Sequence, residues 1–171
     1  MPNTYTKIAS VSLGSAAATI SFTSIPSTYT DLLLLGSLRN SAVDTNTDSV
    51  LTFNSNTSNY SARRLAGTGT AAESSTQGAT NGYYWALTGE GTSWTANTFS
   101  NGSIYIPNYT SSNNKSISTD AVAENNGTAA SAQLVAGLWS NSAAITSITL
   151  TSGSGNYVQY STATLYGISK S

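Results

Sequence analysis

Short segments in which apolar and polar residues alternate recur along the whole chain, and they constrain its fold more than any other feature. Residues at two-residue spacing share a face of a strand, since successive side chains point to opposite sides. Such sets are Ile20 and Phe22; Leu51 and Phe53; Ile104 and Ile106; Leu134, Ala136 and Leu138; and Ile148 and Leu150. No segment keeps a helical period for three turns. The chain is therefore predicted to be all-β, with no substantial helix.

The predicted strands are separated by clusters of Gly, Asn, Ser and Thr, which are typical of turns. They cover residues 5–13, 19–23, 31–39, 50–54, 60–67, 83–88, 102–107, 115–124, 130–139, 146–151 and 161–168. Residues 67–81 are expected to be the least ordered stretch, residues 41–49 and 152–156 to be loops, and Asn125-Asn126-Gly127 to be a hairpin turn. Many short strands without intervening helices predict one antiparallel β-sandwich domain of jelly-roll type over residues 1–171.

The composition removes most of the usual means of catalysis. The chain has no His and no Cys, and only 8% of its residues are charged, against about 25% in a typical soluble domain. Its seven Asp and Glu residues are scattered along the chain. They give no obvious pair facing each other across the roughly 5–9.5 Å that glycoside hydrolysis requires. We therefore expect no enzymatic activity, no catalytic residue and no cofactor.

Charge and hydropathy argue against two further classes of partner. The net charge is −1, and the only adjacent basic pair, Arg63-Arg64, would point to opposite faces of a strand. Nucleic-acid binding needs a clustered basic face, so we do not expect it. The longest purely apolar run, residues 32–35, is far shorter than the about 20 residues of a membrane helix. The first 25 residues also lack the pattern of a signal peptide.

One spacing resembles a metal site. Asp44, Asn46 and Asp48 reproduce the first three ligands of a calcium loop, D-x-N-x-D. Ser49 then replaces the turn glycine, and Ser55 stands where the bidentate Glu is needed. The alternative is a solvated turn in which Asp and Asn bond to nearby backbone. We expect no required metal, with these three residues as a weak candidate.

Two sets of residues are candidates for a partner interface. Tyr83 and Trp94 flank a Gly-rich turn and could be exposed contacts, although a sandwich can also bury both rings. Residues 1–7 are polar apart from Tyr5 and could form an arm. The interface candidates are Asn3, Thr4, Tyr5, Lys7, Tyr83 and Trp94.

Several whole segments carry a resemblance to known proteins. They are MPNTYTKIASVSLGSA (1–16), FTSIPSTYTDLLLL (22–35), LTFNSNTSNYSARRL (51–65), IYIPNYTSSNNKS (104–116), ENN (124–126), LWSNSAAITSITL (138–150) and LYGI (165–168). In these segments the chain resembles a family of small structural proteins of tailed, especially marine, bacteriophages. The resemblance implies a β-sandwich virion protein that decorates or extends the particle, and it carries over no catalytic residue.

The function expected from these features is capsid decoration, in which the protein cements the outer surface of the phage head. The expected partners are the major capsid protein and the protein itself, as a homotrimer by analogy with such proteins. The protein would be made in the bacterial cytoplasm and reside in the virion. The alternative is a tail-fibre or knob-type adhesion domain that binds a host glycan through exposed aromatic residues such as Tyr83 and Trp94.

Overall fold

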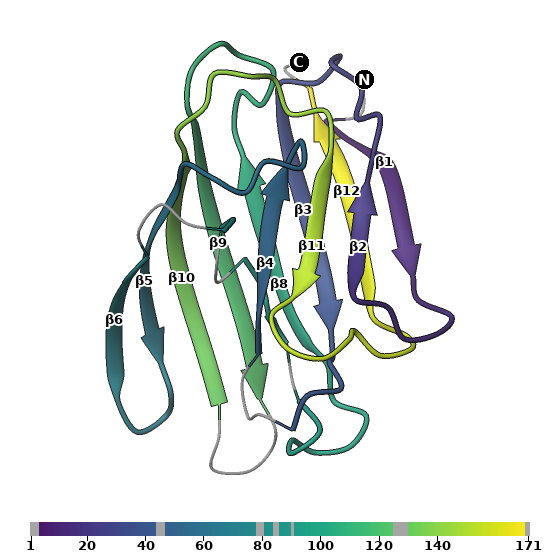
Figure 1. The fold of residues 1–171 in the computed structure, drawn as a ribbon, viewed down its shortest axis with the longest axis vertical. Coiled ribbons are helices and arrows are strands. Elements are labelled where there is room, and N and C mark those ends of the chain that lie inside the picture. The colour runs from purple at the N-terminus through teal and green to yellow at the C-terminus, as the bar shows by residue number, and fades with distance from the viewer. Residues whose placement is uncertain are drawn as a thin grey trace.

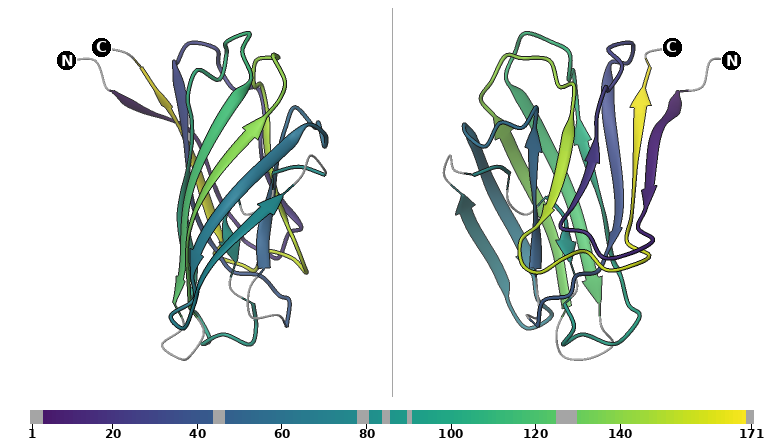
Figure 2. Two further views of the ribbon diagram at one scale, coloured as in Figure 1. Left: turned by 90° about the vertical axis from the view of Figure 1, so that its left-hand side faces the viewer. Right: turned by 45° about the vertical axis from the view of Figure 1, so that its right-hand side comes forward.

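The structure is a computed structural model that describes residues 4–43, 47–77, 81–83, 86–89, 91–124 and 130–169. Over these residues the chain forms twelve β-strands and no helix. The strands make two antiparallel sheets that pack face to face (Figures 1 and 2). The prediction of an all-β sandwich is confirmed.

The eight-stranded sheet, here the large sheet, has the order β1-β12-β3-β8-β9-β10-β5-β6, and the small sheet has the order β2-β11-β4-β7. The strands are β1 (Tyr5–Ser12), β2 (Thr19–Phe22), β3 (Asp31–Leu38), β4 (Thr47–Phe53), β5 (Tyr60–Gly67), β6 (Ala72–Gln77), β7 (Thr88–Gly89), β8 (Ser100–Ile106), β9 (Lys115–Glu124), β10 (Ala130–Trp139), β11 (Ile148–Ser152) and β12 (Thr162–Ile168).

The strand order has the nested pairing of a jelly roll, as the sequence predicts. In the large sheet β1 pairs with β12 and β3 pairs with β8, whereas in the small sheet β2 pairs with β11 and β4 pairs with β7. These pairs alternate between the two sheets along the chain, which is the arrangement of two interlocked Greek keys. The hairpins β5-β6 and β9-β10 extend the large sheet on one side, and Figure 1 shows β5 and β6 lying beyond the small sheet.

The core lies between the two sheets and contains the apolar residues that the alternation predicts. Phe22 and Phe53 of the small sheet and Leu34 and Ile104 of the large sheet are at most 3% exposed. Phe53 also packs against Tyr60 and Trp139, with ring centroids 6.0 and 5.4 Å away. Burial of such side chains is the main driving force for folding, at about 1.5–3 kcal/mol for each large one.

Glycines on the inner face of the large sheet receive the side chains of Tyr83 and Leu87. A Cβ at Gly137 would lie 2.3 Å from Cε2 of Tyr83, and one at Gly36 would lie 2.5 Å from Cδ1 of Leu87. The strand predicted at residues 83–88 is not formed at residues 83, 86 and 87, and residues 84 and 85 lie outside the described residues. Tyr83 forms an isolated bridge with Leu51, and the strand β7 is only Thr88–Gly89, because Tyr83 and Leu87 are turned into the core.

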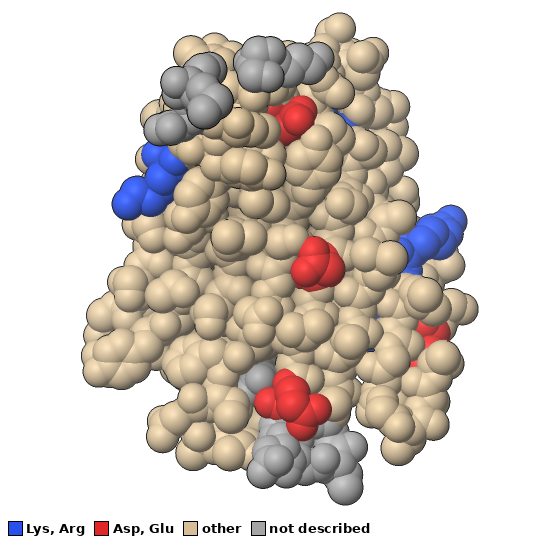
Figure 3. Space-filling model, turned by 180° about the vertical axis from the view of Figure 1, so that it is seen from behind, with Lys and Arg blue, Asp and Glu red and all other residues tan. Residues whose placement is uncertain are grey.

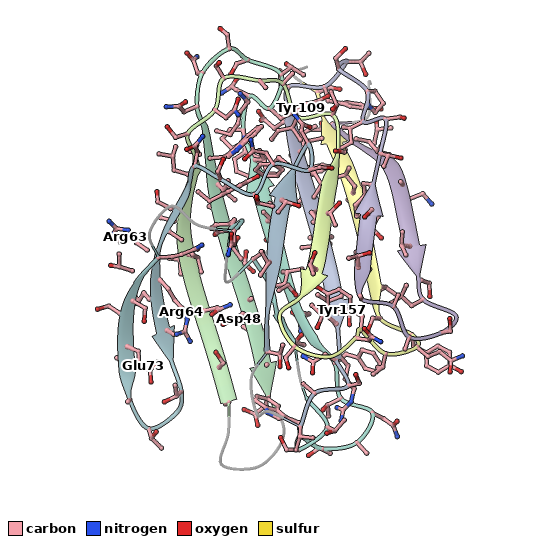
Figure 4. All side chains as sticks on the ribbon, viewed as in Figure 1. Asp48, Arg63, Arg64, Glu73, Tyr109 and Tyr157 are labelled. Carbon is pink, nitrogen blue, oxygen red and sulfur yellow. The ribbon has the colours of Figure 1, made fainter. Side chains whose placement is uncertain are left out.

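The stretch expected to be least ordered contains a strand. Residues 72–77 form β6, which pairs with β5 along its whole length. Backbone hydrogen bonds to β5 hold this edge strand in place. An ion pair between Arg64 of β5 and Glu73 of β6, 3.7 Å apart, adds a side-chain contact (Figure 4). The start of β4 at Thr47 likewise shortens the loop predicted at residues 41–49. The turn predicted at residues 125–127 lies outside the described residues.

Candidate functional site

The outer face of the large sheet carries most of the exposed large apolar side chains. Nine such residues occur in the part of the chain that the structure describes, and seven of them lie on this face. They are Tyr5, Leu35, Leu65, Tyr105, Val122, Leu134 and Leu138. The other two, Val43 and Tyr160, lie outside the strands. Several exposed large apolar side chains gathered on one face are typical of a contact surface.

The strand register brings four of these residues together on β5, β9 and β10: Leu65, Val122, Leu134 and Leu138. Leu134 lies directly opposite Leu65 of β5, and Ala132, two residues earlier on β10, lies opposite Val122 of β9. Leu134 and Leu65 are about 60% exposed. Ala132 and Gly67 form the next outward-facing pair along these two strands, and their small size leaves a shallow hollow of about 440 Å³, lined also by Val122 and Ala72. The result is an apolar patch on β9, β10 and β5.

Charged side chains are sparse on this outer face, as Figure 3 shows. Asp120 of β9 accepts a hydrogen bond from Ser103 Oγ at 2.5 Å. Asp31 accepts hydrogen bonds from the Tyr105 hydroxyl and from the Asn108 amide, both at 2.8 Å. The hydrogen bond to Asp31 raises the pKa of Tyr105, because it favours the protonated phenol. The carboxylates are thus held in defined positions on a mostly neutral surface.

The expected N-terminal arm is wrong for its last three residues. Tyr5 and Lys7 belong to β1 and pair with Ile168 and Tyr166 of β12, because the edge of the large sheet offers them backbone partners. Both are exposed on the outer face. Thr4 is exposed, and its carbonyl accepts a hydrogen bond from the Ser169 amide at 3.1 Å. Asn3 lies outside the described residues.

Tyr83 and Trp94 are buried, so their assignment as exposed interface residues is wrong. Tyr83 is 0% exposed and Trp94 is 4% exposed. The Tyr83 hydroxyl donates to Thr119 Oγ1 at 3.1 Å, inside the sandwich. Trp94 lies in a loop wrapped around Arg39, whose guanidinium donates to the carbonyls of Trp94, Thr95 and Thr98 at 2.9–3.3 Å. Tyr83 belongs to the core between the sheets, whereas Trp94 is buried within its own loop.

The weak calcium motif is only partly described. Asp48 lies on β4, where its carbonyl accepts a hydrogen bond from the Gly153 amide, while Asp44 and Asn46 lie outside the described residues. Over the described residues, no group of three or more His, Cys, Asp and Glu could hold a metal ion.

One S-x-x-K spacing, the arrangement of some serine nucleophiles, occurs at Ser112–Lys115. The Lys115 ammonium donates to the carbonyls of Ser111 and Asn113, at 2.8 and 2.5 Å. Desolvation by burial lowers the pKa of Lys115. These contacts give the ammonium a structural role, in which it ties the turn before β9 to the strand.

Sequence reasoning missed the apolar patch because it placed Leu134, Ala136 and Leu138 on one face of a strand without deciding whether that face is buried or exposed. Leu134, Ala136 and Leu138 alternate correctly, but they face outward, while Val135 and Trp139 on the opposite face are 1% exposed. The signal that could have decided between the faces is Trp139, since so large a ring is seldom left on a surface.

The chain was compared with protein-family models, with curated proteins and with solved structures, and none matched. Within the described residues, no helix is long and apolar enough to cross a membrane.

Proposed function

We propose that this protein is a non-enzymatic capsid decoration protein of a tailed bacteriophage, which binds the outer surface of the head and cements its shell. The observation that carries the proposal is the outer face of the large sheet, with seven exposed large apolar residues and few charges. The resemblance of the sequence to phage structural proteins supplies the class of partner, which is the protein shell of the particle.

The dimensions of the face suit a protein partner better than a small ligand. Eight strands spaced about 4.8 Å apart, with about seven residues of about 3.3 Å each, present roughly 900 Å². A specific protein interface covers about 800 Å² on each partner. Because few charges lie on this face, binding would depend on apolar burial and on hydrogen bonds from its Ser and Thr side chains.

The residues that could perform chemistry are engaged in structural contacts, which supports a non-enzymatic role. Arg39 donates to three backbone carbonyls, Lys115 to two, and Glu73 pairs with Arg64. The chain has no His or Cys to act as a general base or a thiol nucleophile.

The alternative of a glycan-binding adhesion domain loses the two residues that were named for it. Tyr83 and Trp94 are buried and offer no aromatic platform to a sugar. Decoration is therefore the function that the described surface supports best.

Binding to heads tests the proposal. Purified protein is mixed with heads that lack it, and the fraction that co-sediments is measured. We expect saturable binding that Leu35→Lys weakens, because Leu35 is 41% exposed on the outer face. The matched control is Val43→Lys, which changes an 80% exposed residue outside the strands and is expected to bind normally. Absence of binding by the unmodified protein, or equal binding by both variants, would contradict the proposal.

A further inference from the structure

The apolar patch on β9, β10 and β5 leads to a prediction about self-association. We propose that a second copy of this chain packs on this patch, face to face, in a two-fold symmetric dimer centred on Leu134. The dimer would cover the outer face of β8, β9, β10, β5 and β6, and it would leave the outer face of β1, β12 and β3 to the shell. It would replace the homotrimer, which was expected by analogy alone. The inference does not depend on the decoration role, because the mass of the protein in solution tests it and binding to heads does not enter.

The register on the outer face is suited to a two-fold partner. Leu134 of β10 has Asp120 of β9 on one side and Leu65 of β5 on the other. A two-fold axis in the plane of the interface and parallel to β10 would place Leu134 against the same residue of the second copy. It would also place β9 of each copy over β5 of the other. Two sheets packed in this way keep their strands within about 30° of each other, as in aligned sandwiches.

The charges on this part of the face favour that axis. Arg63 lies on the outer face of β5, opposite Ala136, and is two residues from Leu65. With the axis along β10, Asp120 lies over Leu65 of the second copy, and Arg63 of that copy is about 7 Å further along the strand, within reach of its long side chain. Two symmetric ion pairs result. A two-fold axis in the plane of the interface but perpendicular to β10, through the same point, would place Asp120 of one copy against Asp120 of the other. Repulsion between the two carboxylates disfavours this arrangement.

The area is sufficient for a stable contact. The five strands β8, β9, β10, β5 and β6 are adjacent in the large sheet. At about 4.8 Å between strands and about 3.3 Å per residue, they cover roughly 24 by 23 Å. Two such faces bury on the order of 1,100 Å² in total, above the about 1,000 Å² expected of a biological interface. The hollow beside Leu134 can receive apolar side chains of the second copy.

Light scattering coupled to size-exclusion chromatography, over a series of concentrations, measures the association. We expect a species of twice the 17.6 kDa chain mass. Leu134→Lys is expected to raise the dimer Kd by about a hundredfold, because a residue on the axis is lost from both sides of the interface. The lysine would also lie beside Asp120 of its own chain, which favours folding. The matched control is Leu35→Lys on β3. Leu35 lies on the same face and at the same height along the strands as Leu134, but outside the proposed contact, so the dimer Kd of this variant should not change.

A charge-reversal series tests the orientation of the two copies. Arg63→Asp and Asp120→Arg should each weaken the dimer about tenfold. The double variant should restore most of the affinity, because the pairs form again with opposite sign. Circular dichroism verifies that each variant is folded. If Leu134→Lys does not fold, the charge-reversal series alone tests whether the dimer forms in the proposed orientation. A monomer at every concentration, a trimer, or a dimer that neither Leu134→Lys nor the single reversals weaken would overturn the inference.

Discussion

Replacing Tyr83 with Phe should make the protein less stable at neutral pH but more stable at strongly alkaline pH. The Tyr83 ring is fully buried against Gly137, and its hydroxyl donates to Thr119 Oγ1. Desolvation by burial raises the pKa of Tyr83 from 10.0 to about 12, despite the hydrogen bond to Thr119, which lowers it. The phenol therefore stays protonated in the folded state at a pH where the unfolded chain already loses the proton.

The size of the effect follows from that difference in pKa. The stability linked to the raised pKa of Tyr83 is fully present below pH 10, its pKa in the unfolded chain. It is lost as the pH rises from 10 through about 12, the pKa in the folded protein. At 1.36 kcal/mol per pKa unit, the loss at pH 12 is about 2 kcal/mol. Tyr83→Phe removes this loss but also removes one hydrogen bond, which costs about 1 kcal/mol at any pH. The variant should be about 1 kcal/mol less stable at pH 7 and more stable by a similar amount at pH 12.

Urea unfolding at pH 7, 9, 11 and 12, followed by circular dichroism, measures the difference between the two proteins. Thr119→Val is the matched control, because it removes the same hydrogen bond and keeps the buried phenol. Its stability relative to the unmodified protein should not improve at pH 12. A stability difference between Tyr83→Phe and the unmodified protein that stays constant across this pH range would refute the reasoning.

Three further substitutions should destabilise the fold. The Asn54 side-chain amide forms hydrogen bonds with the backbone of Ala144, Thr146 and Ser147, and Asn54 itself has a left-handed backbone conformation. Asn54→Ala removes these bonds and should lower the free energy of unfolding by about 3 kcal/mol, measured as a lower melting temperature. Gly137→Ala places a Cβ against the Tyr83 ring and should cost about 2 kcal/mol in urea unfolding. Arg39→Met removes the guanidinium that donates to the carbonyls of Trp94, Thr95 and Thr98. Limited proteolysis should then cleave within residues 91–98. Unchanged resistance to the protease would contradict the role of Arg39.

The alternation of apolar and polar residues predicted strands well where the two faces of the strand differ clearly in polarity. Strands β5, β9 and β10 have the predicted bounds, and the β2 and β8 residues expected in the core are buried. Prediction failed where burial depends on which segment covers a strand. Residues 83–88 are apolar enough for a strand, but Tyr83 and Leu87 fill the space that Gly137, Gly36 and Gly102 leave in the large sheet. β6 contains no large apolar residue and forms through pairing with β5 alone.

The candidate surface was harder to predict than the fold. The outer face of β10 has the composition of a core face, and only the tertiary arrangement shows that Leu134 and Leu138 are exposed. The arm expected at residues 1–7 was read from polarity, but the backbone of Tyr5 and Lys7 pairs with β12. Polarity describes side chains and gives no information on where backbone hydrogen bonds are made.

The proposed decoration of a phage head is tested most directly by the number of copies of this protein in each particle of the phage that encodes it. A protein that cements the head covers its shell, whereas an adhesion domain occurs only at the tail or its fibres. Quantitative gel densitometry of purified particles, with the major capsid protein as the internal standard, gives the ratio. We expect hundreds of copies, comparable in number to the major capsid protein. A count of a few tens or fewer would contradict decoration and favour the adhesion alternative.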